Sequence, residues 1–192
     1  MKCLWILPAM LAVAAPALAG DIHGKVVAKG ARTSADAVVY VDKIAGKTFP
    51  APAAHARIDQ KNMKFIPRVA AVVAGTTVDF LNSDAVLHNV FSPDACADHF
   101  NLGTWPQGQS KSFTFKTDCF AALMCKVHPD MEGFVAVLPT PYFAVTSADG
   151  SYQIKDVPDG TYTVKVWHPT LKGAQKSVQL KTSSEVNFEV AK

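Results

Sequence analysis

Short runs in which hydrophobic and polar residues alternate follow one another along almost the whole chain. In the run at residues 160–168, the apolar side chains Tyr162, Val164 and Val166 fall on one side of an extended strand and polar side chains fall on the other. The Ala-Asp-Gly turn at 148–150 separates two such runs, as in a β-hairpin. Residues after the first 19 show almost no helical periodicity. The pattern predicts an all-β chain built as sandwiches.

The apolar runs and the turn residues between them locate the individual strands. The expected strands span residues 22–28, 37–42, 55–59, 68–74, 76–82, 88–92, 110–116, 121–127, 133–139, 142–147, 151–157, 160–168, 176–181 and 185–190.

Residues 1–19 differ from the rest of the chain and predict a secretory signal peptide. Lys2 gives a positive end, residues 4–19 are apolar, and the Ala-Leu-Ala triplet at 17–19 favours cleavage before Gly20. A membrane anchor is the alternative, but the apolar run is shorter than the roughly 20 residues that a spanning helix needs. We therefore expect export to the periplasm and no stable membrane insertion.

Composition and charge narrow the range of partners. Of the 192 residues 49% are hydrophobic, which is enough for a buried core. Without Lys2, the 19 basic residues become 18 against 16 acidic ones, a formal charge of +2. The basic residues form no long run, so the sequence does not predict nucleic-acid binding.

Three of the four cysteines lie outside the signal peptide, and three is an odd number. In an oxidising compartment two can pair and one is left over. Cys125 has His128 and Met131 close by in sequence, so it is the natural one to leave free. A Cys96–Cys119 disulfide is then expected; two separate buried thiols are the alternative.

Four residues with soft side chains predict a copper site. Cys125, His128 and Met131 occur at a spacing of three, and His88 begins an earlier predicted strand. Thiolate and thioether ligands select copper, and two His with one Cys and a distant axial Met form the blue-copper arrangement. Zinc is the main competitor, but structural zinc sites prefer four Cys or His ligands.

These motifs resemble those of the cupredoxins. "LHNVFS" at 87–92 and "CKVHPDMEGFVAV" at 125–137 are most similar to amicyanin, with its Cys-x-x-His-Pro-x-Met loop, and to pseudoazurin. The resemblance covers about residues 54–139. It implies a Greek-key β-sandwich that holds one type 1 copper ion, alternating between Cu(I) and Cu(II) as it transfers single electrons.

The resemblance also implies roles for neighbouring residues. Asn89 ties the two ligand loops together by hydrogen bonds. Pro129 has no N–H, so it withholds one possible donor from the Cys125 sulfur and tunes the potential. Phe91 and Phe134, with Pro129, offer an apolar rim for a partner, although core packing is the simpler reading for Phe134. The residues before Cys125 depart from the family, which usually has Gly and an aromatic pair there.

The two ends of the chain resemble a second β-sandwich, of the carboxypeptidase-regulatory-like, transthyretin type. Residues 20–42 look like its first strands, and 143–190, with the pattern DG-x-Y-x-I-x-x-V-P-x-G-x-Y, look like the others. We expect that the copper domain is inserted into this sandwich. An N-terminal hairpin followed by two separate domains is the alternative. The expected division is 1–19 signal peptide; 20–49 and 140–192 second sandwich; 50–139 cupredoxin.

No motif for catalysis accompanies the predicted copper site. The sequence contains no His-x-His pair for further copper ions, no HExxH and no phosphate-binding loop. We expect a non-enzymatic electron carrier between redox proteins such as a dehydrogenase and a c-type cytochrome. Copper delivery or homeostasis is the alternative, although Met- and His-rich tracts are missing. A surface module with a vestigial site is a third reading, and the intact ligand set counts against it.

Overall fold

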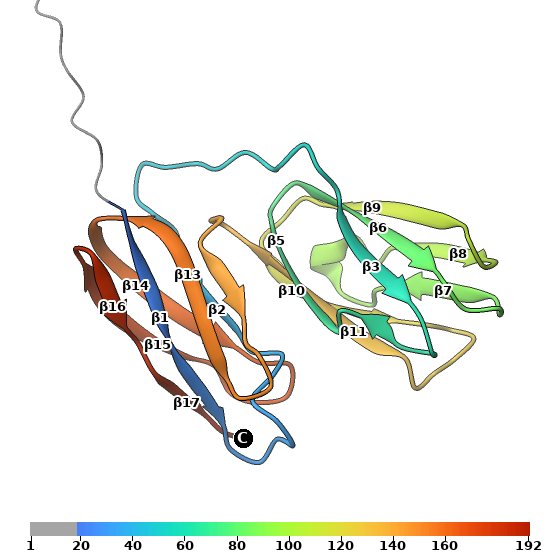
Figure 1. Cartoon of the computed structure of the whole chain (residues 1–192). Helices are drawn as coiled ribbons and strands as arrows, with labels where there is room; N and C mark the ends of the chain where they lie inside the picture. The colour runs from blue at the N-terminus through green and yellow to red at the C-terminus, as the bar shows by residue number, and fades with distance from the viewer. Residues whose placement is uncertain (1–18) are drawn as a thin grey trace, which may run out of the picture.

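The computed structural model describes residues 19–192, and nearly all of its regular structure is β-strand. The predicted signal peptide lies outside the described residues, apart from Ala19. Among the described residues, no helix has the length and apolar character needed to cross a bilayer. The strands form four sheets, which pair into two sandwiches that lie side by side (Figure 1).

The terminal sandwich is built from both ends of the described chain. One sheet has the order β13-β1-β16, with β17 also paired to β1, and the other has the order β12-β2-β14-β15. Its strands are β1 (Ala19–Ala28), β2 (Val38–Val41), β12 (Phe143–Val145), β13 (Ser151–Pro158), β14 (Gly160–Trp167), β15 (Ala174–Leu180), β16 (Ser183–Glu185) and β17 (Phe188–Val190). Their inward side chains, such as Ile22, Val164 and Leu180, form one buried cluster.

The central sandwich takes up the chain between β2 and β12. A four-stranded sheet with the order β4-β3-β6-β9 packs against a five-stranded sheet with the order β5-β11-β10-β7-β8. The elements are β3 (Ala56–Gln60), β4 (Phe65–Ile66), β5 (Val69–Val73), β6 (Thr76–Asn82), β7 (His88–Phe91), the 3-10 turn η1 (Ala95–Ala97), β8 (Asn101–Trp105), β9 (Ser110–Phe115), β10 (Cys119–Met124) and β11 (Glu132–Leu138). Residues 42–55 connect β2 to β3 and cross the top of the view in Figure 1.

An apolar layer joins the two sandwiches. The rings of Phe120 on β10 and Trp167 on β14 stack with centroids 4.5 Å apart, and Tyr40 and Phe134 pack edge-on against them. Each such aromatic pair contributes about 0.5–1.5 kcal/mol beyond its buried area. The five-stranded sheet of the central sandwich is therefore covered on its second face by the terminal sandwich.

Arg68 adds a polar link beside this layer. Its guanidinium donates to Asp36 of the terminal sandwich at 3.0 Å and to Glu132 of β11 at 2.7 Å. Because Glu132 directly follows Met131, this link reaches the end of the predicted copper loop.

The predicted all-β sandwich class is confirmed, and so is the disulfide. Cys96 in η1 is bonded to Cys119 at the start of β10, with their Cα atoms 6.2 Å apart, and Cys125 is a free, buried thiol. Two short strands, β4 and β8, are additional to those predicted. The strand expected at 185–190 is divided into β16 and β17.

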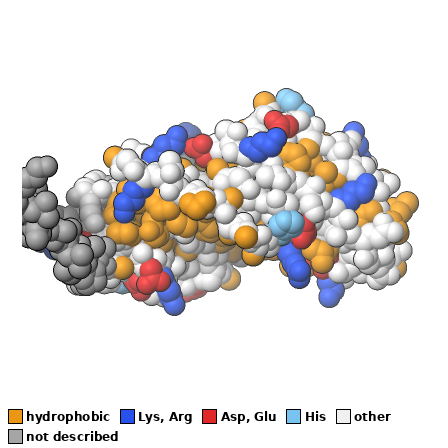
Figure 2. All heavy atoms as spheres, turned by 90° about the horizontal axis from the view of Figure 1, so that it is seen from above, with side chains coloured by type: hydrophobic (Ala, Val, Ile, Leu, Met, Phe, Trp, Pro, Cys, Tyr) orange, Lys and Arg blue, Asp and Glu red, His pale blue; other side chains and the backbone are white. Residues whose placement is uncertain are grey.

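The surface agrees with the mixed charge of the sequence. On the face shown in Figure 2, Lys and Arg side chains are scattered and interspersed with Asp and Glu. This face offers no continuous basic patch of the kind that binds nucleic acid.

Candidate metal centre

The strand ends of the central sandwich bring the predicted ligands together. Cys125 follows the last residue of β10, and His128 and Met131 lie in the loop that leads into β11. His88 is the first residue of β7, which pairs antiparallel with β10 through Met124 and Phe91. In an antiparallel pair, the start of one strand lies at the same end of the sheet as the end of its neighbour. His88 at the start of β7 therefore lies beside the loop that follows β10.

The nitrogen and sulfur atoms of three of these residues form a triangle. The Nδ1 atoms of His88 and His128 are 3.1 Å apart, and the Cys125 Sγ lies 3.9 Å from the first and 4.0 Å from the second. A point roughly 2 Å from all three atoms exists inside this triangle, and metal–nitrogen and metal–sulfur bonds measure about 2.0–2.3 Å. The donor atoms therefore fit one soft metal ion.

Burial separates the four residues into three that are enclosed and one that reaches the surface. His88 is 0% exposed, Cys125 3% and Met131 1%, whereas His128 is half-buried. Met131 belongs to the same apolar cluster as Cys125, and its N–H donates to the His128 carbonyl at 3.0 Å, which closes the loop. Of the four side chains, only that of His128 reaches the surface to a substantial degree.

Asn89 connects the two segments that carry the ligands, as expected for this residue. Its backbone N–H donates to the Cys125 sulfur at 3.4 Å, and its side-chain oxygen accepts from the Lys126 N–H at 3.2 Å. Its side-chain nitrogen donates to Asn101 Oδ1 and to the Gly103 carbonyl of β8, both at 2.8 Å. The buried amide thus fixes the Cys125 loop against β7 and β8.

Replacing Asn89 by alanine tests this connection. The change keeps the backbone donor to sulfur but leaves the Lys126 N–H and the Gly103 carbonyl without their partner, which costs about 2 kcal/mol. We expect urea unfolding of the metal-free protein to show this loss. Thr104→Ala, at an exposed position of β8, is the control and is expected to change stability by less than about 0.5 kcal/mol. Equal stability of the two variants would contradict the role given to Asn89.

A carboxylate that sequence reasoning missed lies behind His88. Asp84 Oδ2 is 2.8 Å from the second ring nitrogen of His88, Nε2. Burial raises the pKa of Asp84, but hydrogen bonds from the Met63 N–H, His88 and the Asn62 N–H outweigh it and hold this pKa below its usual value. The only sequence signal was an acidic residue four positions before a predicted ligand.

The exposed apolar side chains around the site differ from those predicted to form its rim. Pro129 is exposed beside His128, but Phe134 is 9% exposed and packs on Trp167 between the sandwiches. Phe91 is half-buried under the Lys126 ammonium, 5.3 Å from the ring centre. Other apolar side chains supply the exposed surface next to the ligands: Val86, Leu87 and Val127 are 41%, 54% and 46% exposed.

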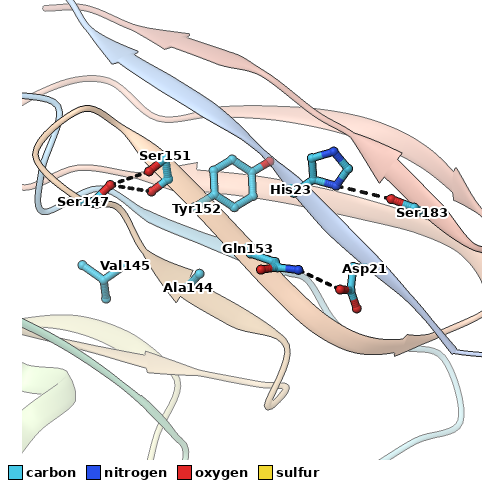
Figure 3. Close-up of a pocket in the computed structure, with 9 residues that line it drawn as sticks. All are labelled: Asp21, His23, Ala144, Val145, Ser147, Ser151, Tyr152, Gln153 and Ser183. Carbon is cyan, nitrogen blue, oxygen red and sulfur yellow. Dashed lines mark hydrogen bonds between the residues drawn. The ribbon is translucent and has the colours of Figure 1, made fainter.

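A hollow elsewhere on the molecule has a different chemistry. It measures about 740 Å³ and lies in the terminal sandwich, with polar side chains from β1 and β13 (Figure 3). Asp21 accepts from Gln153 at 2.8 Å, and the His23 ring lies 3.3 Å from the Ser183 hydroxyl. These groups satisfy one another on the surface, and none belongs to the cluster of metal-binding side chains.

Comparison with protein families gives two matches on this chain. Residues 52–138 match the model of the copper-binding proteins of the plastocyanin/azurin family. Residues 140–188 match the model described as polysaccharide lyase family 4, domain II; this segment covers β12–β16 and the first residue of β17. No curated protein matches the chain.

Several solved structures are similar to part of the chain. A purple cupredoxin from Nitrosopumilus maritimus is 26% identical, with 43% of this chain and 98% of that one covered and a TM-score of 0.39. A mutant of amicyanin in the Cu(I) form is 25% identical over 45% of this chain and 85% of that one, with a TM-score of 0.42. A copper-containing nitrite reductase from Thermus scotoductus is 21% identical over 52% of this chain and 25% of that one, with a TM-score of 0.43.

The family match and the donor triangle fall on the same segment of the chain. The predicted ligand residues all lie within 52–138, and the free cysteine, two histidines and buried methionine occur in the order that the cupredoxin resemblance implied. Residues 52–138 therefore form a β-sandwich domain that matches the copper-binding plastocyanin/azurin family, packed against a β-sandwich whose carboxy-terminal strands match polysaccharide lyase family 4, domain II.

Proposed function

We propose that the protein is a periplasmic type 1 copper protein that carries single electrons between redox proteins and is not itself an enzyme. His88, Cys125 and His128 would hold one copper ion, with Met131 as a distant fourth ligand. The bound ion would supply a one-electron Cu(I)/Cu(II) couple. The observation that carries the proposal is the buried donor triangle, because its two nitrogens and one sulfur suit both oxidation states of copper.

The way the ligands are held supports electron transfer over substrate chemistry. Hydrogen bonds of Asn89 and the disulfide-linked β10 fix the ligands in a rigid frame, so little has to move when the charge on the ion changes. Met131 and Cys125 are buried, which disfavours access of a substrate from their side of the site. The half-buried His128 ring is the shortest way from the ion to a partner.

Exposed apolar residues support a docking surface at the same end of the molecule. Leu87 directly precedes His88 and Val127 directly precedes His128 in sequence, and both are exposed, which favours a docking surface beside the half-buried ring. Such patches on a soluble surface mark interaction sites. The partners proposed are a dehydrogenase as electron donor and a c-type cytochrome as acceptor.

The disulfide supports the proposed compartment. Structural disulfides persist in the bacterial periplasm and are rare in the cytosol, where thiols are kept reduced. With the predicted signal peptide, this favours export. We also propose that residues 50–139 are one domain inserted between residues 20–49 and 140–192 of another.

The proposal is tested by voltammetry and self-exchange on the mature protein loaded with one equivalent of copper. We expect a reversible one-electron couple and fast electron exchange between the oxidised and reduced forms. Irreversible reduction, together with rapid release of Cu(I) to a chelator, would instead favour copper delivery.

Pro129 offers a finer test of the same site. Pro129→Ala restores an N–H next to His128; if this N–H reaches the Cys125 sulfur, the thiolate donates less strongly to copper. We expect the reduction potential to rise by on the order of 50 mV, somewhat less than a tenfold change in relative affinity for the two oxidation states. An unchanged potential in voltammetry would exclude a tuning role for Pro129.

A further inference from the structure

The second ring nitrogen of His88 has a charged partner. Nε2 is 2.8 Å from Asp84 Oδ2, His88 is completely buried, and the side chain of Asp84 is only 15% exposed. An ionised carboxylate can only accept, so the ring donates its Nε2–H. The lone pair of Nδ1 then points at the site, where the His128 Nδ1 and the Cys125 Sγ lie.

Asp84 is itself held in place by a turn on another part of the sandwich. In the turn between β3 and β4, the Asn62 N–H donates to Oδ1 at 2.7 Å and the Met63 N–H donates to Oδ2 at 2.9 Å. Both residues have positive φ, 54° and 55°, which turns their adjacent N–H groups toward the same carboxylate. The Asp84 N–H donates to Asn82 Oδ1 at 2.9 Å, which fixes the loop from the other side.

We propose that Asp84 is a positioning residue that orients His88 for copper and lowers the reduction potential of the site. The inference rests on the proposed function. A carboxylate bonded to a ligating imidazole fixes its ring and makes it a stronger donor. Its negative charge, screened little at this depth, stabilises Cu(II) more than Cu(I). Because the β3–β4 turn holds Asp84 in place, this turn also influences the reduction potential, although it carries no ligand.

A purely structural role would give a different result. If Asp84 only tied the 83–87 loop to the β3–β4 turn, its loss would lower stability and leave the potential unchanged. Asp84→Asn separates the two roles, because it keeps the size and one acceptor oxygen of the side chain and removes its charge.

The experiment compares the wild type with Asp84→Asn and with Ser83→Ala, each loaded with one equivalent of copper. Ser83 is the matched control: it lies in the same loop and its hydroxyl donates to Asp59 at 2.7 Å, away from His88. We expect Asp84→Asn to keep the visible band and to weaken Cu(II) binding about tenfold relative to Cu(I), an upward shift of about 59 mV. Ser83→Ala is expected to leave the potential unchanged.

Two results would overturn the inference while the proposed function stands. One is an unchanged potential in Asp84→Asn with the band intact. The other is an equal shift in Ser83→Ala. A second readout does not depend on copper: nitrogen NMR of the metal-free wild type must find the His88 proton on Nε2, and a proton on Nδ1 would contradict the positioning role. A wild type without a copper band would overturn the redox part together with the proposed function, and the NMR result would still decide the orientation of His88.

Discussion

Cys125→Ser is expected to abolish the intense visible absorption of the copper-loaded protein. The band of a type 1 site arises from charge transfer between a thiolate and Cu(II), and a serine hydroxyl offers no comparable soft donor. The change is nearly isosteric at a buried position, so the metal-free protein should keep its β-sheet circular dichroism. The measurement is a Cu(II) titration followed in the visible range.

Met131, the other sulfur-containing residue of the candidate site, provides the comparison. Met131→Leu keeps an apolar side chain of similar volume in the core. Because the thioether is the weak axial ligand in a type 1 copper site, we expect the band to shift in position and survive. If Cys125→Ser kept the band, or if Met131→Leu lost it completely, the roles assigned to the two sulfurs would be wrong.

Loss of the Cys96–Cys119 disulfide should have the largest effect on stability among the changes considered. Cross-linking two residues 23 positions apart stabilises a fold by about 3 kcal/mol in the loop-entropy model. The bridge fastens η1 to the first residue of β10 and closes a loop that contains β8 and β9. Urea unfolding of the metal-free double variant Cys96→Ser, Cys119→Ser measures this loss.

The copper spectrum of the same double variant is the internal control. Cys119 is the first residue of β10 and Cys125 follows its last residue, which places them roughly 20 Å apart for an extended strand of this length. We therefore expect an unchanged band in the folded variant. A loss of stability below about 1 kcal/mol, or a disturbed band, would show that the bridge does not act as described.

The sequence pattern was sufficient for strands with a regular alternation of buried and exposed residues. In β6 the burial alternates along the strand, and this run was predicted with the correct bounds. β4 has only two residues, Phe65 and Ile66, too few to show any period. β8 contains Gly103 and mostly exposed side chains, so its sequence carries no apolar face.

The division of the last predicted strand has a local cause. Asn187 accepts the Lys25 N–H with its side-chain oxygen at 2.7 Å, in place of a backbone carbonyl. β1 therefore pairs with β16 up to His23 and with β17 from Val26, with a break between them. A side chain that takes the place of a backbone hydrogen bond between strands does not change the alternation of apolar and polar residues. The sequence pattern therefore could not predict the break.

The residues of the candidate site also fall into two groups, those that the sequence could predict and one that it could not. Cys125, His128 and Met131 could be recognised because their spacing is local, and His88 because of the residues that follow it. Asp84 could not, because its role depends on the β3–β4 turn, whose Asn62 and Met63 amides lie more than twenty residues away in sequence. Contacts made by backbone groups of any residue type carry no sequence signature.

The most direct test of the copper site is a Cu(II) titration of the purified protein, with its disulfide intact, followed by its absorption in the visible range. We expect an intense band that grows linearly and stops at one equivalent, and that is missing in Cys125→Ser. A protein that binds no copper, or that binds it without this band while its fold is intact, would contradict the assignment of His88, Cys125, His128 and Met131 as a type 1 copper site.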